Sequence, residues 1–170
     1  MMTTLAEGKL TFIFPASCQV SKYDEWSFCR CQFQSVAGGC KAVDILCIDS
    51  NVSWLIEVKD YRHHPRTKPS CIADEFAIKV KDTLAGLAAA AKMANDPNEK
   101  QQAGQSLKTK KWRAVLHLEQ SSIQSRLRPG SATTASLLQK LRTGKLRAID
   151  AHPIICGRTH LHASIPWCVQ

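Results

Sequence analysis

The feature that most constrains the fold is a pair of apolar segments separated by a short polar turn. Residues 41–49 (KAVDILCID) and 52–61 (VSWLIEVKDY) have the composition of strands, and Ser50 and Asn51 between them suit a two-residue hairpin loop. Both segments are apolar on both faces, which is typical of strands in a sheet that is covered on each side. The sequence therefore predicts an α/β layer architecture built around this hairpin.

The flanking segments supply further elements for a mixed central sheet flanked by helices. Apolar residues recur at three- and four-residue intervals from Ile72 to Ala91, which predicts a helix over 72–95 that begins at a Ser70 cap and packs on the sheet. Residues 96–110 have almost no apolar content and are expected to form an exposed loop. The other predicted elements are strands around 12–20, 26–33, 111–119 and 148–156, and a short helix at 132–142.

Composition places the chain among globular domains. Its 170 residues are 44% hydrophobic and 22% charged, which suffices to bury a core without disulfides or a structural metal. We expect one domain over residues 1–170, with a core at about 10–120 and a basic C-terminal extension at about 121–170. No run approaches the roughly 18 apolar residues of a membrane span, and the first residues lack a basic leader. A cytoplasmic protein without a membrane partner is the expectation.

The eight cysteines are expected to be reduced thiols. Cys47 and Cys156 lie in apolar stretches, where a thiol behaves as a small hydrophobic group, and the chain is larger than disulfide-dependent secreted scaffolds. The cysteine and histidine groups closest in sequence are Cys29 with Cys31, and Cys156 with His160, His162 and Cys168. Neither group has the paired spacing of a structural zinc site, so zinc is not expected.

The net charge of +9 is concentrated in the C-terminal part of the chain. Residues 1–99 carry 11 basic and 12 acidic side chains, whereas residues 100–170 carry 12 basic and two acidic ones. A one-sided basic surface suggests a polyanionic partner such as nucleic acid or an anionic membrane face. The alternative is that these residues only keep a small domain in solution.

One face of the predicted hairpin gathers two carboxylates and an ammonium group. A two-residue loop at Ser50 and Asn51 places Asp44 directly opposite Glu57 on the antiparallel ladder. Directly paired residues point to the same face with Cβ atoms about 4.5–5.5 Å apart, and Lys59, two residues on, shares that face. The flanking residues on this face are apolar, so a purely structural surface pair is the less favoured interpretation.

Two adjacent carboxylates repel each other, and burying them without compensation is costly. A divalent cation would resolve the conflict, because Mg²⁺ or Mn²⁺ takes hard oxygen ligands such as carboxylates. Such an ion can polarise a phosphodiester and lower the pKa of a bound water, while Lys59 positions the attacking water. The pattern therefore predicts a Mg²⁺ (or Mn²⁺) site at Asp44 and Glu57 that hydrolyses phosphodiester bonds.

The segment KAVDILCIDSNVSWLIEVKDYR resembles the PD-(D/E)xK nuclease superfamily, whose members have a restriction-endonuclease-like or Holliday-junction-resolvase-like fold. Val43-Asp44 stands in the place of the family's Pro-Asp, and Glu57-x-Lys59 in that of its (D/E)xK. The resemblance covers about residues 10–120 and implies an α-β-β-β-α-β core. It also implies that Asp44 and Glu57 are metal ligands and that Lys59 is the catalytic lysine.

Family members often supply another acid from a helix before the sheet. Only about nine residues precede the first predicted strand here, so the sequence leaves Glu7, Asp24 and Glu25 open as candidates. The last 50 residues resemble nothing identifiable, which leaves the role of residues 121–170 unassigned.

Basic residues near the predicted site are candidates for phosphate contacts, because a loop that follows the ExK strand should lie at the rim of the site. The candidate nucleic-acid-binding residues are Arg62, Arg66, Lys68, Lys110, Lys111 and Arg113. A merely solvated loop is the alternative for the first three, and Trp112 is expected in the core of its strand rather than stacked on a base. Secondary candidates are His63 and His64 as a general base, and Lys79, Lys81 and Lys108 as substrate contacts.

These observations lead to a metal-dependent endonuclease, a hydrolase with DNA as its expected substrate. A second hypothesis is a catalytically silent nuclease-fold module that binds nucleic acid within a defence or DNA-processing assembly. A third is a partner for an acidic protein. The sequence leaves open whether RNA replaces DNA, and whether a homodimer or larger assembly is needed to cut two strands.

Overall fold

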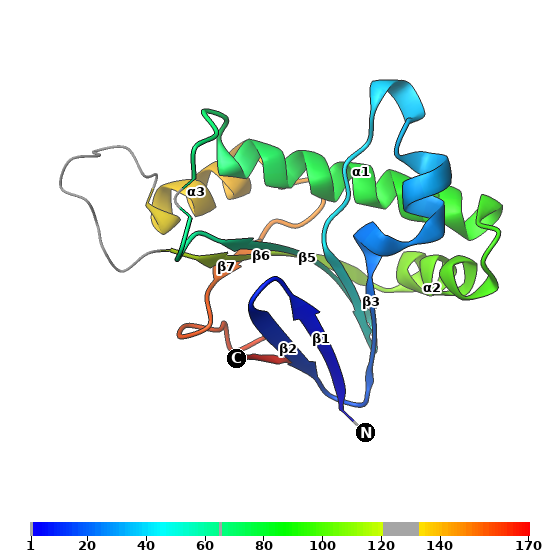
Figure 1. The fold of residues 1–170 in the computed structure, drawn as a ribbon, viewed down its shortest axis with the longest axis horizontal. Helices are drawn as coiled ribbons and strands as arrows, with labels where there is room; N and C mark the ends of the chain where they lie inside the picture. The colour runs from blue at the N-terminus through cyan, green and yellow to red at the C-terminus, as the bar shows by residue number, and fades with distance from the viewer. Residues whose placement is uncertain (1, 65, 121–132) are drawn as a thin grey trace.

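The computed structural model describes residues 2–64, 66–120 and 133–170, which form two sheets and several helices (Figure 1). The elements in chain order are β1 (Thr3–Glu7), β2 (Leu10–Phe14), β3 (Cys18–Lys22), β4 (Ile45–Asp49), β5 (Val52–Asp60), α1 (Ile72–Met93), α2 (Pro97–Lys108), β6 (Lys111–Glu119), α3 (Thr134–Lys140), β7 (Ile154–Cys156) and β8 (Cys168–Val169). Short helical turns lie at Tyr23–Glu25, Cys29–Phe33, Val36–Gly38 and Leu141–Lys145.

The central sheet has the order β3-β4-β5-β6-β7 and is mixed. The β3-β4 and β4-β5 pairs are antiparallel, while β5-β6 and β6-β7 are parallel. The predicted hairpin register is confirmed, since Asp49 pairs with Val52 and Ile45 with Ile56. Ser50 adopts the left-handed backbone conformation (φ 49°) that a two-residue hairpin loop requires.

Both faces of the central sheet are covered, as the doubly apolar strands predicted, but helices cover only one of them. Leu46, Leu55 and Leu116 pack beneath α1 and α2. On the other face lies a three-stranded sheet of order β1-β2-β8 (Figure 1). Its apolar residues pack in one cluster with Ile56 and Val115. The mixed α/β class is confirmed, and one of the expected helical layers is an antiparallel sheet.

Residues 96–110, expected to be an exposed loop, contain α2, so that prediction is wrong. The Asp96 side chain caps the helix by accepting hydrogen bonds from the backbone N–H groups of Asn98 and Glu99 (2.7 and 3.3 Å), and Pro97 occupies the first turn. The helix buries only small side chains, among them Ala103 and Ser106. A pattern of large apolar residues therefore could not reveal it.

The N-terminal elements also differ from expectation. The region expected to hold a strand over 26–33 instead forms a helical turn at Cys29–Phe33, and the single strand expected around 12–20 is split between β2 and β3. The first strand, β1, already occupies Thr3–Glu7, so no helix precedes the sheet within the described residues. The α1 cap is Cys71 rather than Ser70.

The end of the chain belongs to both sheets. β7, shorter than the strand expected over 148–156, pairs with β6, and β8 pairs with β2 through Phe12 with Val169. The eight cysteines are free thiols. Among the described residues, no helix is both long and apolar enough to cross a membrane.

Candidate functional site

Asp44 and Glu57 lie under α1, on the helix-covered face of the central sheet. Asp44 immediately precedes β4, and its Oδ2 accepts a hydrogen bond from the backbone N–H of Val58 (2.7 Å). Glu57 lies within β5, where its side chain is 1% exposed. The predicted grouping of these two acids on one face is therefore present in the structure.

The segment before β4 is fixed by α1, and this positions Asp44. The backbone N–H of Val43 donates to Thr83 Oγ1 (3.0 Å), and that of Lys41 donates to Asp82 Oδ2 (2.9 Å). Thr83 is fully buried, so these bonds form in a protected environment. The helix thus holds the chain leading into the acidic residue.

Two lysines compensate the buried carboxylates. Lys79, from α1, places Nζ 2.8 Å from Glu57 Oε2, 2.7 Å from Glu57 Oε1 and 3.5 Å from Asp44 Oδ1. Lys59 Nζ lies 2.5 Å from Glu57 Oε1, on the same face as predicted. We call Asp44, Glu57, Lys59 and Lys79 the charge cluster.

Burial dominates the electrostatics of the charge cluster. It raises the pKa of Glu57 to about 7, the charge of Asp44 adds to this, and Lys79 and Lys59 oppose it. Burial alone would lower the pKa of Lys59, but the adjacent Glu57 and Asp44 outweigh it and raise that pKa. Burial and Asp44 therefore favour the protonated form of Glu57, while the two lysines favour its carboxylate.

The donor set of the charge cluster suits a hard cation. Asp44 and Glu57 would supply carboxylate oxygens to such an ion, and the ammonium of Lys79 contacts both carboxylates. Within the described ranges, no three Asp, Glu, His or Cys side chains gather closely enough to hold a metal ion. An ion at this place would need water for its remaining ligands.

The three candidates for an additional acid are placed differently. Glu7 pairs with Lys22 (3.0 Å), and Glu25 lies 3.4 Å from the same ammonium. Asp24 Oδ1 is buried without a hydrogen-bond partner among the described residues, and its pKa is raised first by burial and then by the charge of Asp44. Of the three, Asp24 is the acid electrostatically coupled to the charge cluster.

The arginines among the predicted nucleic-acid-binding residues are engaged within the chain. Arg62 pairs with Asp60 (2.9 and 2.7 Å). Arg66 pairs with Glu75 (2.8 Å). Arg113 lies over the Trp54 ring, 5.7 Å from its centroid, and 3.3 Å from Asp150 Oδ2.

The three lysines of that group, Lys68, Lys110 and Lys111, are exposed and form no ion pair with another described residue. Two of them belong to residues 108–111 (KTKK), which run from the last residue of α2 to the first residue of β6 and which we call the lysine loop. His63 and His64 are exposed beyond β5. Lys81 pairs with Asp82 at 3.3 Å.

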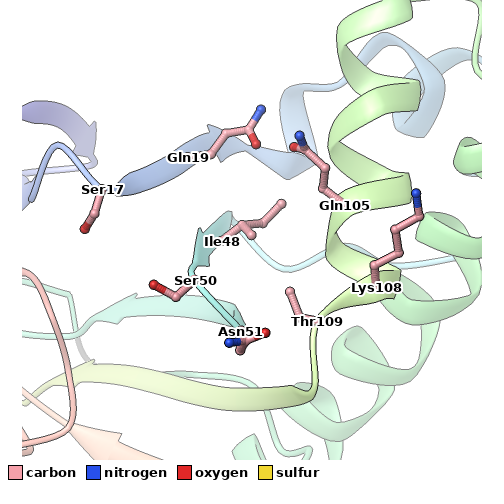
Figure 2. A pocket seen from close by; sticks show the side chains of 8 residues that line it. All are labelled: Ser17, Gln19, Ile48, Ser50, Asn51, Gln105, Lys108 and Thr109. Atoms are coloured by element: carbon pink, nitrogen blue, oxygen red, sulfur yellow. The ribbon is translucent and has the colours of Figure 1, made fainter.

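A hollow lies on each side of the lysine loop. The first, of about 330 Å³, includes Lys108 and Thr109 together with polar residues from β3 and the β4-β5 turn (Figure 2). The second, of about 390 Å³, includes Lys110, Lys111 and Trp112. The loop is the shared wall of the two hollows, since Thr109 lines both.

Lys79 is the member of the charge cluster that the sequence indicates only as a secondary candidate. Its position beside Phe76 and Val80, which are buried in α1, is the signal that could have identified it. A lysine next to the apolar stripe of a helix can turn its ammonium toward buried acids on the facing sheet.

A second buried polar group lies outside the site that the sequence predicts. His117 Nε2 lies 2.9 Å from Glu119 Oε1, and His117 Nδ1 lies 3.9 Å from the thiol of Cys156. Burial raises the pKa of that thiol to about 12, so it stays protonated. These side chains connect β6 to β7, and we interpret them as structural residues.

Comparison with known proteins finds one significant similarity. The chain is 32% identical, over an alignment 208 positions long, to the cysteine--tRNA ligase of Neisseria meningitidis serogroup A, and the alignment covers 99% of the chain. It spans only 30% of that relative's length. No protein-family model and no solved structure matches the chain.

This similarity corrects the function expected from the motif. The relative is named as a ligase, which conflicts with the predicted hydrolase, endonuclease and metal-dependent nuclease classes. Those predictions are therefore contradicted, even though the residues that suggested them lie together. The chain resembles part of an enzyme whose name refers to tRNA and cysteine.

Proposed function

We propose that this chain is a tRNA-binding part of an enzyme that acts on tRNA. The observation that carries the proposal is the similarity of nearly the whole chain to a segment of a cysteine--tRNA ligase. Because the matched segment is 30% of that relative, the proposed role is substrate binding rather than the complete ligation reaction. Ligation itself would need residues outside this segment.

The charge distribution supports an RNA partner. Residues 100–170 carry 12 basic and two acidic side chains, and a basic surface attracts a phosphate backbone by releasing its condensed counterions. The paired arginines of the chain contribute less to this attraction, because their charges are already compensated by Asp60, Glu75 and Asp150. The groups available for phosphate contacts are the exposed lysines, together with the exposed Arg142, Arg147 and Arg158.

We also propose that the central sheet keeps the core arrangement of the PD-(D/E)xK superfamily as a scaffold. The antiparallel β4-β5 hairpin, the helix α1 that follows it and the parallel strand β6 agree with that arrangement. Asp44 and Glu57 would hold Mg²⁺ or Mn²⁺ there, and the ion would neutralise the two carboxylates in place of Lys79. Calorimetric titration with Mn²⁺ tests this, with Glu57→Gln expected to abolish binding.

The tRNA proposal is tested by fluorescence anisotropy with labelled tRNA at several salt concentrations. We expect binding whose log–log slope against salt is negative, by about 0.9 for each duplex phosphate contacted. Duplex DNA of matched charge serves as the comparison, because DNA is the partner that the sequence alone suggested. Absence of tRNA binding at low salt, or stronger binding to the DNA, would contradict the proposal.

A further inference from the structure

We propose that the lysine loop and the hollow beside Trp112 form a binding site for a single RNA strand. This inference rests on the proposed function and names the surface through which it operates. The loop supplies three ammonium groups for phosphates, and the hollow supplies an aromatic wall for a base.

The charge of the lysine loop is uncompensated. Lys108, Lys110 and Lys111 are exposed, and none lies within 4.0 Å of a carboxylate in the described part of the chain. The acid that lines the second hollow, Asp150, is buried and engaged by the N–H of Ala114 (2.9 Å). Three like charges within four residues repel one another, and phosphate groups relieve that repulsion.

The backbone of the lysine loop is fixed, while its lysine side chains are free. Thr109 Oγ1 donates to the carbonyl of Ser106 (2.7 Å) and lies 3.0 Å from the buried Ser53 hydroxyl. The N–H groups of Lys110 and Lys111 both donate to the carbonyl of Asn51 (2.9 and 3.2 Å). A loop held in this way loses little backbone entropy when it binds a ligand.

The second hollow, of about 390 Å³, lies next to these charges. Trp112 lines it, half-buried, and the indole N–H has no hydrogen-bond partner among the described residues. Arg113 and His152 lie at the same hollow, joined by a hydrogen bond from the guanidinium to the His152 carbonyl (2.8 Å). Stacking on an aromatic ring tolerates any base.

The site is distinct from the charge cluster. Lys111 pairs with Val52 at the beginning of β5, whereas Glu57 lies five residues further along that strand. At about 3.3 Å per strand residue, the two sites are separated by roughly 17 Å. An RNA strand on the lysine loop therefore need not touch the buried acids.

The experiment compares two variants with the same change in charge. The variant Lys108→Gln/Lys110→Gln/Lys111→Gln removes the three positive charges of the lysine loop. The control variant Lys9→Gln/Lys41→Gln/Lys92→Gln removes the charges of three exposed lysines elsewhere. Both are titrated with labelled tRNA and with an oligouridylate of about ten nucleotides, within the usual length of single-strand sites. Circular dichroism and thermal melting confirm that each variant is folded.

We expect the lysine-loop variant to bind oligouridylate at least about tenfold more weakly in 0.1 M salt, with a salt slope reduced by about 2, since each single-strand phosphate contact contributes about 0.7. The control variant should stay within about twofold of the wild type. Trp112→Leu should weaken binding by about tenfold, and Trp112→Phe should retain most of it, because the ring is what a base stacks on.

The outcomes distinguish failure of the proposed lysine-loop site from failure of the proposed tRNA-binding function. If the wild type binds both RNAs and the lysine-loop variant does so equally well, the site is wrong and the function stands. If oligouridylate binding depends on the loop but tRNA does not bind, the site stands and the function is wrong. If both charge variants bind RNA equally weakly, the loss reflects the net charge of the protein rather than a specific site, and the proposed site is wrong.

Discussion

At the scale of single residues, Lys79 is the member of the charge cluster that joins α1 to both buried acids. Its ammonium contacts both carboxylates, and its side chain is only 22% exposed. Removing the charge leaves two acids facing each other in a buried position, which raises the cost of ionising either one. The lysine therefore stabilises the acidic pair beneath the helix.

Lys79→Met is expected to lower the free energy of unfolding by about 1–3 kcal/mol, less than a fully buried broken pair because Glu57 can take up a proton. Adding Glu57→Gln to this variant should recover part of the loss, since the repulsion with Asp44 disappears. Urea denaturation of the two single variants and the double variant measures the coupling. Strict additivity of the two changes would contradict a direct interaction.

The ion pair of Glu75 with Arg66 makes a pH-dependent contribution. The adjacent guanidinium, which is the largest cause, lowers the pKa of Glu75 from 4.5 to about 2. The folded protein therefore binds fewer protons than the unfolded chain between these values, so the stabilisation is complete above about pH 5 and is lost as the pH falls toward 2.

Glu75→Gln should cost about 1–2 kcal/mol at pH 7, after allowance for the partial exposure of the pair. The difference between wild type and variant should shrink as the pH falls from 4.5 toward 2. Urea denaturation at pH 3 and pH 7 measures it. The same difference at both pH values would show that the contribution is not the ion pair.

At the scale of elements, the hairpin and the helix α2 show why some segments could be predicted and others could not. The β4-β5 hairpin combines apolar strands with a polar two-residue turn, and each signal acts locally. α2 has its cap and proline in the sequence, but it packs through small side chains such as Ala103, for which hydrophobic periodicity is weak.

The packing of α1 against the N-terminal segment depends on a glycine. A Cβ on Gly86 would overlap the hydroxyl of Tyr23 and lie 3.2 Å from the Phe33 ring. Tyr23 is buried, so it has little room to move. Gly104 in α2, by contrast, has nothing within 4 Å of the same position.

Gly86→Ala should therefore destabilise the protein by about 1–3 kcal/mol, as overpacking of a core does. Gly104→Ala, at an open helical position, should stabilise it by about 0.5–1 kcal/mol, because alanine loses less backbone entropy on folding. Thermal melting of the two variants gives the signs. A destabilised Gly104→Ala with an unchanged Gly86→Ala would contradict the packing described for α1.

At the scale of the whole molecule, the last two strands, β7 and β8, form an edge of each sheet. The sequence predicted a core at about 10–120 and a basic C-terminal extension of the same domain at about 121–170. Two strands of that extension, β7 and β8, join the central and the small sheet. Val169 and Trp167 are buried against Phe14 and its neighbours in the apolar layer between the sheets. Part of the extension is thus built into the fold.

Two neighbouring positions in β8 test this. Val169 is buried and Cys168 is exposed, because successive strand residues point to opposite faces. Val169→Asp should lower the free energy of unfolding by about 3 kcal/mol or more, since an unpaired carboxylate enters the core. Cys168→Asp should change it by less than about 0.5 kcal/mol. Equal effects in denaturant titrations would place β8 outside the folded core.

The sequence by itself determined the hairpin, its register and the gathering of Asp44, Glu57 and Lys59 on one face. Those features follow from the two-residue turn and the strand period of two, both of which are local. Three features could be found only from the tertiary structure: the ammonium of Lys79 lies between the acids, the small sheet covers the opposite face, and the lysine loop is hydrogen-bonded to Asn51. These features join segments far apart in the chain, so the physical reason lies in packing and charge compensation, which no local pattern encodes.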